Sequence, residues 1–150
     1  MRIKKASSED LESVAFLFDL YRQFYEQPSD PEAAEIFLSD RIKNNESVIF
    51  LAQDESNDKA MGFVQLYPLF TSVGMKRIWL LNDLYVHPDH RKKGVAEVLM
   101  EKSREFAAET NAKGIILETQ KTNSQAQNLY DKLGYKRDKE HFYFYLETGE

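Results

Sequence analysis

The sequence predicts a mixed α/β fold, a central sheet with helices on its faces. Three observations carry this prediction: two helix patterns near the start, two strand patterns around the polar turn Asp54–Lys59, and an alternation of strand and helix patterns in the second half. Two strands joined by a short polar turn form a hairpin, whereas strands alternating with helices build a layered α/β unit. The chain has 150 residues, so we expect 1–150 to form one domain.

The first third of the chain predicts a strand followed by two helices. Residues 2–6 alternate weakly as a short strand, and Ser7 with Asp10 is typical of a capping box at a helix start. Apolar residues then recur at helical spacing as far as Tyr25. Asp30-Pro31 predicts a second helix, with proline in the first helical position.

The remaining elements follow from hydrophobic periodicity and from turn residues. Strands are expected at 47–53, 60–67 and 76–86, and a helix at about 93–109. Gly114 then opens a buried strand, Ile115–Leu117. A helix over 124–132 should end at Gly134, and the alternating aromatic segment 141–147 predicts a last strand.

Composition narrows the classes of function. The absence of cysteine excludes disulfides, thiolate metal sites and a cysteine nucleophile, and it agrees with a cytoplasmic location. No apolar stretch suggests a signal peptide or a span of a bilayer, so we expect no membrane association. The net charge of −5 disfavours nucleic acid as a partner and suits a cationic substrate.

The segment from Asn82 to Ala96 carries the strongest functional signal. A strand pattern ends at Val86, a basic segment with one glycine follows, and a helix begins. The N–H groups at a helix start are unpaired and partly positive, and glycine lets a ligand approach the main chain. The residues that would hold a phosphate group here are Arg91, Lys92, Lys93, Gly94, Val95 and Ala96. A basic run by itself is usually only a solvated loop.

This segment resembles the acetyl-CoA-binding signature of the GNAT N-acetyltransferases, Arg/Gln-x-x-Gly-x-Gly/Ala, in the form Arg91-x-x-Gly94-x-Ala96. The resemblance covers nearly the whole chain. It implies the GNAT fold, a mostly antiparallel sheet with acetyl-CoA in the opening between two central strands. The pantetheine arm of acetyl-CoA would then pair with the backbone of Leu84, Tyr85 and Val86.

A second block, Asn123-Ser124-x-Ala126-x-x-Leu129-Tyr130-x-x-x-Gly134-Tyr135, is similar to the last helix of the same family. From the residues alone, Tyr130 reads as a core aromatic and Asn123 as a helix cap. The resemblance implies that Tyr130 lies near the thioether sulfur of acetyl-CoA and protonates the leaving thiolate. It also implies that Asn123 contacts the pantetheine arm or the substrate.

His87, Asp89 and His90 lie within four residues and could in principle bind zinc. Pro88 predicts a turn in which their side chains diverge, and no second cluster supplies further ligands. We therefore expect no metal.

The general base is left open by the sequence. Family members similar to the diamine acetyltransferases read Leu-Glu-Asp where this chain reads Leu81-Asn82-Asp83, and an amide is no base. Asp83 would point to the opposite face of a regular strand, unless a bulge re-aims it. Glu118 and Gln120 share a face of the next expected strand. Asp83, Glu118 and water connected to bulk solvent remain the alternatives.

The resemblance also suggests the acceptor. Tyr25 and Glu26 match positions that line the acceptor pocket of the diamine-type relatives, and Asn82, Asp83, Glu118 and Gln120 complete the candidate set. These features favour a small primary amine, such as a polyamine, a lysine-like compound or an amino acid derivative. The alternatives are a protein lysine or N-terminus, and a non-catalytic acyl-CoA-binding regulatory module. The aromatic segment 142–146 predicts a homodimer, because a terminal strand with two apolar faces needs cover.

Overall fold

The computed structural model describes residues 1–149. They fall into two compact units, Met1–Glu118 and the described residues from Thr119 onward, and each is described by itself. That the whole chain is a single domain remains a prediction.

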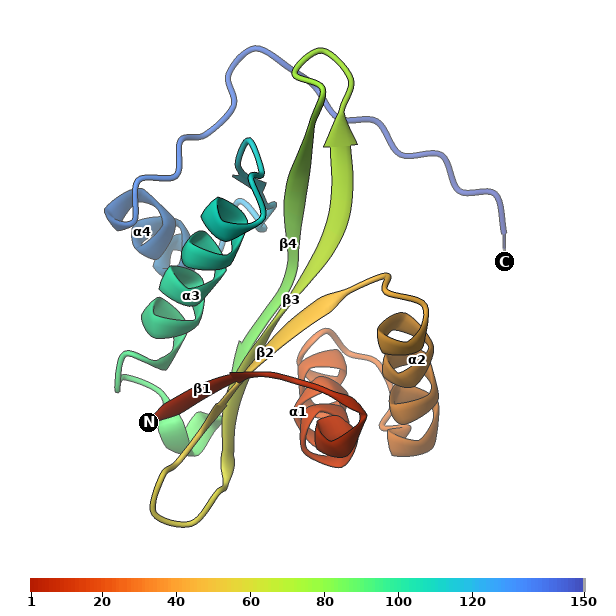
Figure 1. Ribbon diagram of the computed structural model, residues 1–150, viewed down its shortest axis with the longest axis vertical. Coiled ribbons are helices and arrows are strands. Elements are labelled where there is room, and N and C mark those ends of the chain that lie inside the picture. Colours follow the sequence, from red (N-terminus) through yellow and green to blue (C-terminus); the bar gives the residue numbers. More distant parts are fainter. Residues whose placement is uncertain (150) are drawn as a thin grey trace. The chain divides into compact units, whose positions relative to one another are not determined.

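The first unit is built on a five-stranded sheet in the order β1-β2-β3-β4-β5 (Figure 1). Its strands are β1 (Arg2–Lys5), β2 (Val48–Gln53), β3 (Ala60–Thr71), β4 (Lys76–Val86) and β5 (Ile115–Ile116). The first four pair antiparallel, and β5 runs parallel to β4. The mixed α/β prediction is confirmed. The expected buried strand Ile115–Leu117 is shorter than predicted, and Ile116 is 41% exposed because only one neighbouring strand holds it.

Helices cover both faces of this sheet. Helices α1 (Leu11–Phe24) and α2 (Pro31–Lys43) lie on one face and α3 (Val95–Glu109) lies on the other (Figure 1). The predicted caps are present: Ser7 and Asp10 form a capping box around the short 3-10 turn Ser8–Asp10, and Asp30 accepts the N–H of Ala33. These bonds pair N–H groups that have no partner within the helix.

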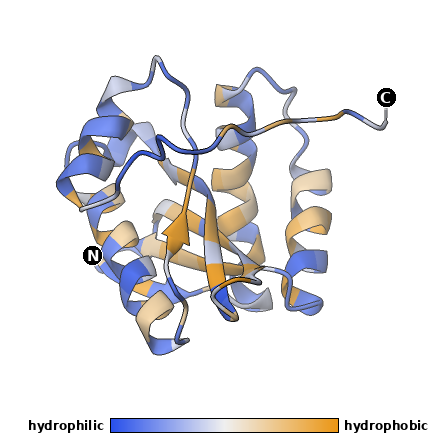
Figure 2. Cartoon of the chain, turned by 90° about the horizontal axis from the view of Figure 1, so that it is seen from above, coloured by the Kyte–Doolittle hydropathy of each residue, from blue (hydrophilic) through white to orange (hydrophobic). Residues whose placement is uncertain are grey.

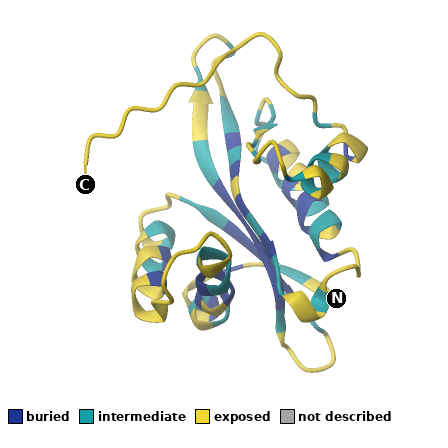
Figure 3. Cartoon of the chain, turned by 180° about the vertical axis from the view of Figure 1, so that it is seen from behind, coloured by how far each residue is buried: buried dark blue, intermediate teal, exposed yellow. Residues whose placement is uncertain are grey.

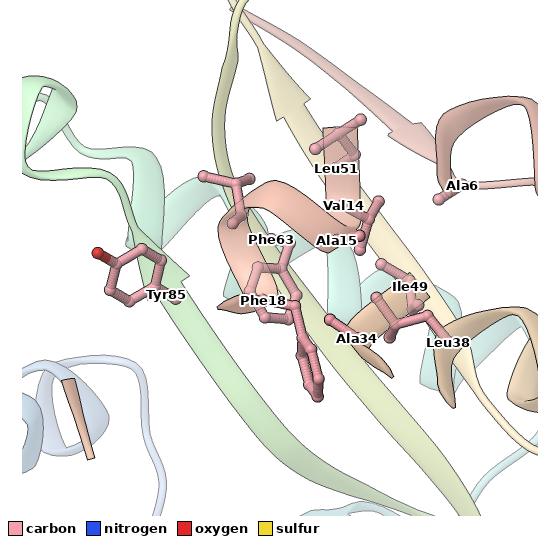
Figure 4. Packing of buried hydrophobic residues seen from close by; sticks show 11 residues of the cluster. Ala6, Val14, Ala15, Phe18, Ala34, Leu38, Ile49, Leu51, Phe63 and Tyr85 are labelled. Atoms are coloured by element: carbon pink, nitrogen blue, oxygen red, sulfur yellow. The ribbon is translucent and has the colours of Figure 1, made fainter. Parts of the chain in front are cut away.

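The core follows from the alternation along β2 and β3. Residues Ile49, Leu51 and Phe63 pack against Phe18 and its neighbours in α1 and α2, and Figure 4 shows this cluster. The strands are the most hydrophobic part of this unit in Figure 2, and their central residues are buried in Figure 3. A sheet that is apolar on both faces explains why helices cover both.

A β-bulge in β4 decides which side chains reach which face. Leu66 pairs with Leu81 and Gln65 pairs with Asp83, so Asn82 is the extra residue of β4. Before the bulge, the Trp79 ring packs on Phe106 of α3 with ring centroids 5.1 Å apart. After it, the Tyr85 ring contacts Tyr21 of α1 at 6.1 Å. Odd-numbered side chains therefore change face at Asn82.

The second unit contains α4 (Ser124–Lys132), which begins and ends as predicted. The side chain of Asn123 caps it, and Gly134 ends it with a φ of +91°. The predicted strand at 141–147 is wrong, because no residue from 136 to 149 lies in a strand. The side chains of Phe142–Leu146 are 82% to 95% exposed (Figure 3). Aromatic alternation needs a partner strand before it can form a sheet, and none pairs with this segment within residues 1–149.

Candidate functional site

The turn between β4 and α3 has the geometry of an anion seat. Gly94 is the N-cap of α3, adopts a left-handed φ of +79°, and contributes no side chain to cap the helix. A Cβ added to Gly94 would meet nothing within 4 Å. Lys92 is also left-handed, with φ of +62°, and such alternation turns successive N–H groups toward one point. The 15-residue helix behind it leaves its first N–H groups for a ligand.

Two contacts fix this turn against the sheet. Arg91 donates from Nε to the carbonyl of Val86 at 3.0 Å, and its guanidinium lies over the ring of Tyr85. Gly62 of β3 lets the end of β4 and the start of α3 come close. A Cβ on Gly62 would lie 2.8 Å from the carbonyl oxygen of Tyr85 and 3.2 Å from Val95. Val95 is buried there, whereas Lys92, Lys93 and Gly94 are exposed and Ala96 is half-buried.

The edge of β4 that leads into this turn is open. Within residues 1–149, β5 pairs with β4 only at Trp79 and Leu80. Beyond the bulge, Leu84, Tyr85 and Val86 pair with β3 alone. The backbone groups on their other side can therefore pair with an extended ligand, as an exposed strand edge does.

Asp83 is the centre of a buried polar cluster. It is 5% exposed, and its carboxylate accepts Nε2 of Gln65 at 2.6 Å and Nδ2 of Asn82 at 3.1 Å. The hydroxyl of Tyr21 supplies a further hydrogen bond. The bulge thus decides the direction of the Asp83 side chain, which the sequence left open. It turns Asp83 inward toward α1 and leaves Asn82 exposed beside it.

Burial raises the pKa of Asp83 above its ordinary value, because a carboxylate loses its hydration there. The hydrogen bonds from Gln65, Tyr21 and Asn82 oppose this rise without cancelling it. Burial and then the charge of Asp83 raise the pKa of Tyr67 to about 12. The same two causes raise the pKa of Tyr21 further, so both phenols stay protonated at neutral pH. A carboxyl group with a raised pKa in such a setting is suited to exchange protons.

The end of α1 lies next to this cluster. Tyr25 is the C-cap of α1, and its ring meets the ring of Tyr21 edge-on at 5.1 Å. It is 43% exposed, so it links the buried Asp83 cluster to the surface. Glu26 is exposed in a left-handed turn with φ of +64°. The structure therefore brings together Tyr25, Asn82 and Asp83 from the predicted acceptor set.

Glu118 and Gln120 are not on one strand face as expected, because β5 ends at Ile116. Both side chains are exposed. Glu118 takes no part in the hydrogen bonds around Asp83 that residues 1–149 make. Gln120 belongs to the second unit, where its carbonyl accepts Nε2 of Gln127. Neither residue lies in a strand because β5, which pairs only with β4 within residues 1–149, ends at Ile116.

The second unit holds Asn123 and Tyr130. The carboxamide oxygen of Asn123 accepts the N–H of Ala126 at 3.1 Å, which is the capping role read from the sequence. Tyr130 is half-buried on α4, and its ring lies 6.0 Å from that of Tyr135. The carbonyl of Tyr130 accepts the N–H of Tyr135 beyond Gly134.

The His87-Pro88-Asp89-His90 segment forms a short 3-10 turn. Nδ1 of His87 accepts the N–H of Asp89 at 3.1 Å, and its ring stacks on Phe16. Among residues 1–149, no group of three or more His, Asp or Glu side chains is arranged to hold a metal ion. Nor does any helix in this part of the chain have the length and apolarity to cross a membrane.

The sequence did not predict three residues of this site. Gln65 and Gly62 sit within an ordinary strand pattern, and Tyr21 looks like one more apolar position of a helix. The buried glutamine in the middle of β3 was the only signal, because a fully buried amide needs a polar partner. The partner itself could not be read from the sequence.

Comparison with known proteins found a family model, relatives and a solved structure that are similar to this chain. The model of the acetyltransferase (GNAT) family matches residues 14–135. The uncharacterized N-acetyltransferase YhfO of Bacillus subtilis is 45% identical over 138 residues, which are 92% of this chain and 91% of that protein. The D-amino-acid N-acetyltransferase HPA3 of Saccharomyces cerevisiae is 30% identical, over 91% of this chain and 86% of HPA3. The crystal structure of a probable acetyltransferase, 39% identical, superposes with a TM-score of 0.95 over 100% of this chain and 99% of the other.

Proposed function

The chain belongs to the GNAT family of acetyltransferases, and from this premise we propose that it acetylates a small primary amine. The family match, with relatives named N-acetyltransferases across most of the chain, makes it an acetyl-CoA-dependent N-acetyltransferase. A purely regulatory acyl-CoA-binding module is therefore set aside. The acceptor and the roles of individual residues are what the proposal adds.

The single observation that carries the use of acetyl-CoA as donor is the anion seat at Arg91–Ala96, which directly follows the open edge of β4. A pyrophosphate would bind the main-chain N–H groups around Gly94, with Lys92 and Lys93 adding positive charge. An extended pantetheine would pair with the backbone of Leu84, Tyr85 and Val86. Gly94 is an exposed N-cap residue without a side chain, and it lies beside an open strand edge. This arrangement fits acetyl-CoA as the donor.

Acidic and aromatic groups near β4 favour a cationic acceptor. Asp83 carries a buried carboxyl group, and the rings of Tyr21 and Tyr25 lie between this group and the surface. Aromatic faces and carboxylates both attract ammonium groups. Glu26 is a further candidate acid and Asn82 a polar contact, and the net charge of −5 acts in the same direction. Glu118 and Gln120 remain candidates on the family resemblance alone. The motif likeness to diamine-type enzymes supports the same choice.

The proposed reaction is a direct transfer. Asp83 takes a proton from the ammonium form of the acceptor, and the neutral nitrogen attacks the thioester carbonyl carbon. The C–N bond forms, the C–S bond breaks, and Tyr130 gives its hydroxyl proton to the departing thiolate. The extra proton on the new amide nitrogen leaves to solvent, from which Tyr130 recovers its own. Asp83 also releases its proton to solvent before the next turnover. Strand N–H groups of β4 would polarise the carbonyl.

The role of Tyr130 is tested by Tyr130→Phe, which removes only the hydroxyl. We expect kcat to fall on the order of a hundredfold with little change in acetyl-CoA affinity, because a proton donor acts in the transition state. A kcat within a few-fold of the unaltered enzyme would make Tyr130 a packing residue.

Asn123 is proposed to touch the pantetheine arm while it caps α4.

The acceptor is tested by a turnover assay with acetyl-CoA and a panel of amines. The panel contains polyamines, lysine-like compounds, L- and D-amino acids, and peptides with a lysine or a free N-terminus. D-amino acids are included because the name of the yeast relative specifies them. We expect a small amine to have the highest kcat/KM, with a rate that rises with pH as the amine loses its proton. A peptide that exceeds every small amine would overturn the proposed acceptor.

The proposal extends to the location and the oligomeric state of the protein. We place the enzyme in the cytoplasm, in keeping with the lack of cysteine. We also propose a homodimer, because the exposed aromatic segment Phe142–Leu146 presents apolar side chains that association would cover. Sedimentation at micromolar concentration should give twice the monomer mass, and a clean monomer would contradict this.

A further inference from the structure

The buried carboxyl of Asp83 needs a route to the acceptor. At 5% exposure, Asp83 is shielded from a bound amine, so a group beside it has to carry the proton. Three side chains donate hydrogen bonds to its carboxylate: Gln65, Asn82 and Tyr21. Each comes from a different element, namely β3, the bulge of β4 and α1.

Chemistry separates these three donors. Gln65 is fully buried, and its Oε1 has no hydrogen-bond partner among residues 1–149, so it offers no path for a proton to the surface. Asn82 is exposed, but a carboxamide does not exchange protons near neutral pH. Tyr21 has a hydroxyl, which donates one proton and accepts another through its lone pairs. It is also half-buried, between the Asp83 carboxylate and the exposed ring of Tyr25.

The ring of Tyr21 is held in place from several sides. It meets Phe63 edge-on at 6.0 Å, Tyr85 at 6.1 Å and Tyr25 at 5.1 Å. These contacts hold the ring beside the Asp83 carboxylate, to which its hydroxyl donates. The raised pKa of Tyr21 means that the phenol does not ionise alone, and its proton can leave only as another arrives.

We propose that Tyr21 is the residue through which Asp83 deprotonates the bound amine. The inference rests on the proposed function, since it requires Asp83 to be the base. The ammonium N–H proton passes to the Tyr21 hydroxyl oxygen as the hydroxyl proton passes to the Asp83 carboxylate. The products are a neutral amine, a neutral Asp83 carboxylic acid and an unchanged tyrosine, so charge and protons balance.

The electrostatic surroundings define a matched control. The titratable groups around Asp83 are Tyr21 and Tyr25 from α1 and Tyr67 from β3, and Arg41 of α2 in turn lowers the pKa of Tyr67. Tyr67 interacts with Asp83 through charge and not through a hydrogen bond. Tyr67→Phe therefore removes a nearby phenol hydroxyl without removing a donor to the carboxylate.

The first test measures the pKa of Asp83 without catalysis. Carboxyl carbons of aspartate labelled with carbon-13 are titrated by NMR, and Asp83→Asn assigns the signal. In Tyr21→Phe the pKa of Asp83 should rise by about one unit, since one charge-assisted hydrogen bond is lost. Tyr67→Phe should leave it unchanged. Replacing Tyr21 by 3-fluorotyrosine, a stronger donor with the same ring, should lower it. An unchanged pKa in both Tyr21 variants overturns the inference.

The second test uses the pH dependence of kcat/KM with the best amine of the panel. In Tyr21→Phe we expect at least a tenfold loss at neutral pH, an acid limb moved to higher pH, and recovery at alkaline pH, where the amine is already neutral. A purely structural role would lower the rate equally at every pH, and that result overturns the relay. If Asp83→Asn keeps full activity while the NMR shift is present, the base of the proposed function is wrong and the hydrogen bond stands.

Discussion

The two halves of β4 share the same alternation of side chains, but their buried side chains differ in character. Before Asn82, Trp79 and Leu81 face α3 and are buried in an apolar layer. After Asn82, Asp83 and Tyr85 face α1, in a layer that also holds Gln65 and Tyr21. One extra residue therefore divides a packing half from a half that we propose to be the chemical half. We expect changes before the bulge to alter stability and changes after it to alter activity.

The largest expected effect lies in the packing half. Trp79→Ala removes a 4% exposed ring that packs at a tilt against Phe106. It also leaves the hydroxyl of Thr110 without the indole N–H, which it accepts at 2.9 Å. The free energy of unfolding should fall by about 3 to 5 kcal/mol, measured by urea denaturation. Activity per folded molecule should be kept. A loss below about 1 kcal/mol would erase the distinction between the halves.

In the chemical half, Asp83→Asn should lower kcat/KM on the order of a hundredfold. Stability should not fall, because a buried charge is removed and the unpartnered Oε1 of Gln65 can turn to accept the new amide. Asp58→Asn is the control for net charge, since Asp58 is exposed in the β2–β3 turn. Unaltered turnover in Asp83→Asn would leave the chemical half without its base.

The turn that follows β4 extends the chemical half. Gly94→Val should weaken acetyl-CoA binding by at least about 2 kcal/mol in calorimetry, because the side chain keeps the phosphate from charged hydrogen bonds. No protein atom opposes the new Cβ, but valine at a φ of +79° strains the turn, so the free energy of unfolding is measured beside the affinity. Gly62→Ala is the contrasting variant: its Cβ would press on the Tyr85 carbonyl and should lower stability instead. Full affinity in a folded Gly94→Val enzyme would refute the phosphate seat.

The smallest effect concerns stability and pH. Burial raises the pKa of Asp83 in the folded state above its ordinary value of 3.8. As pH rises past 3.8, the unfolded chain releases this proton first, so the contribution of Asp83 to stability falls until the folded group also ionises. Unfolding free energies of the unaltered protein relative to Asp83→Asn should decrease across this window and then stay level. An increase with pH would show that the carboxylate is stabilised by its surroundings.

Much of the fold could be predicted because it follows from local rules. Alternation predicted β4 with correct bounds, helical spacing predicted α3, and the Asn123 cap and Gly134 gave α4. The glycine turn proposed to bind a phosphate group could also be read from the sequence, since a strand, a glycine turn and a helix start are neighbours there. Each of these features depends on residues a few positions apart.

The last strand shows where local rules stop. The aromatic alternation at 141–147 is a good strand pattern, yet the segment lies outside any sheet in the structure. A helix closes its own hydrogen bonds, whereas a strand forms only when another strand offers its edge. β5 was overextended for the same reason, and Glu118 was assigned a face that it does not have.

The sequence by itself determined the family, the sheet and helix order through α4, and the glycine turn that can receive a phosphate group. Only the tertiary structure decided which way Asp83 points. Its direction depends on one extra residue in the pairing of β4 with β3, and its hydrogen-bond partners are 18 residues away in Gln65 and on another element in Tyr21. Register between strands is a property of two segments together, so neither segment states it alone.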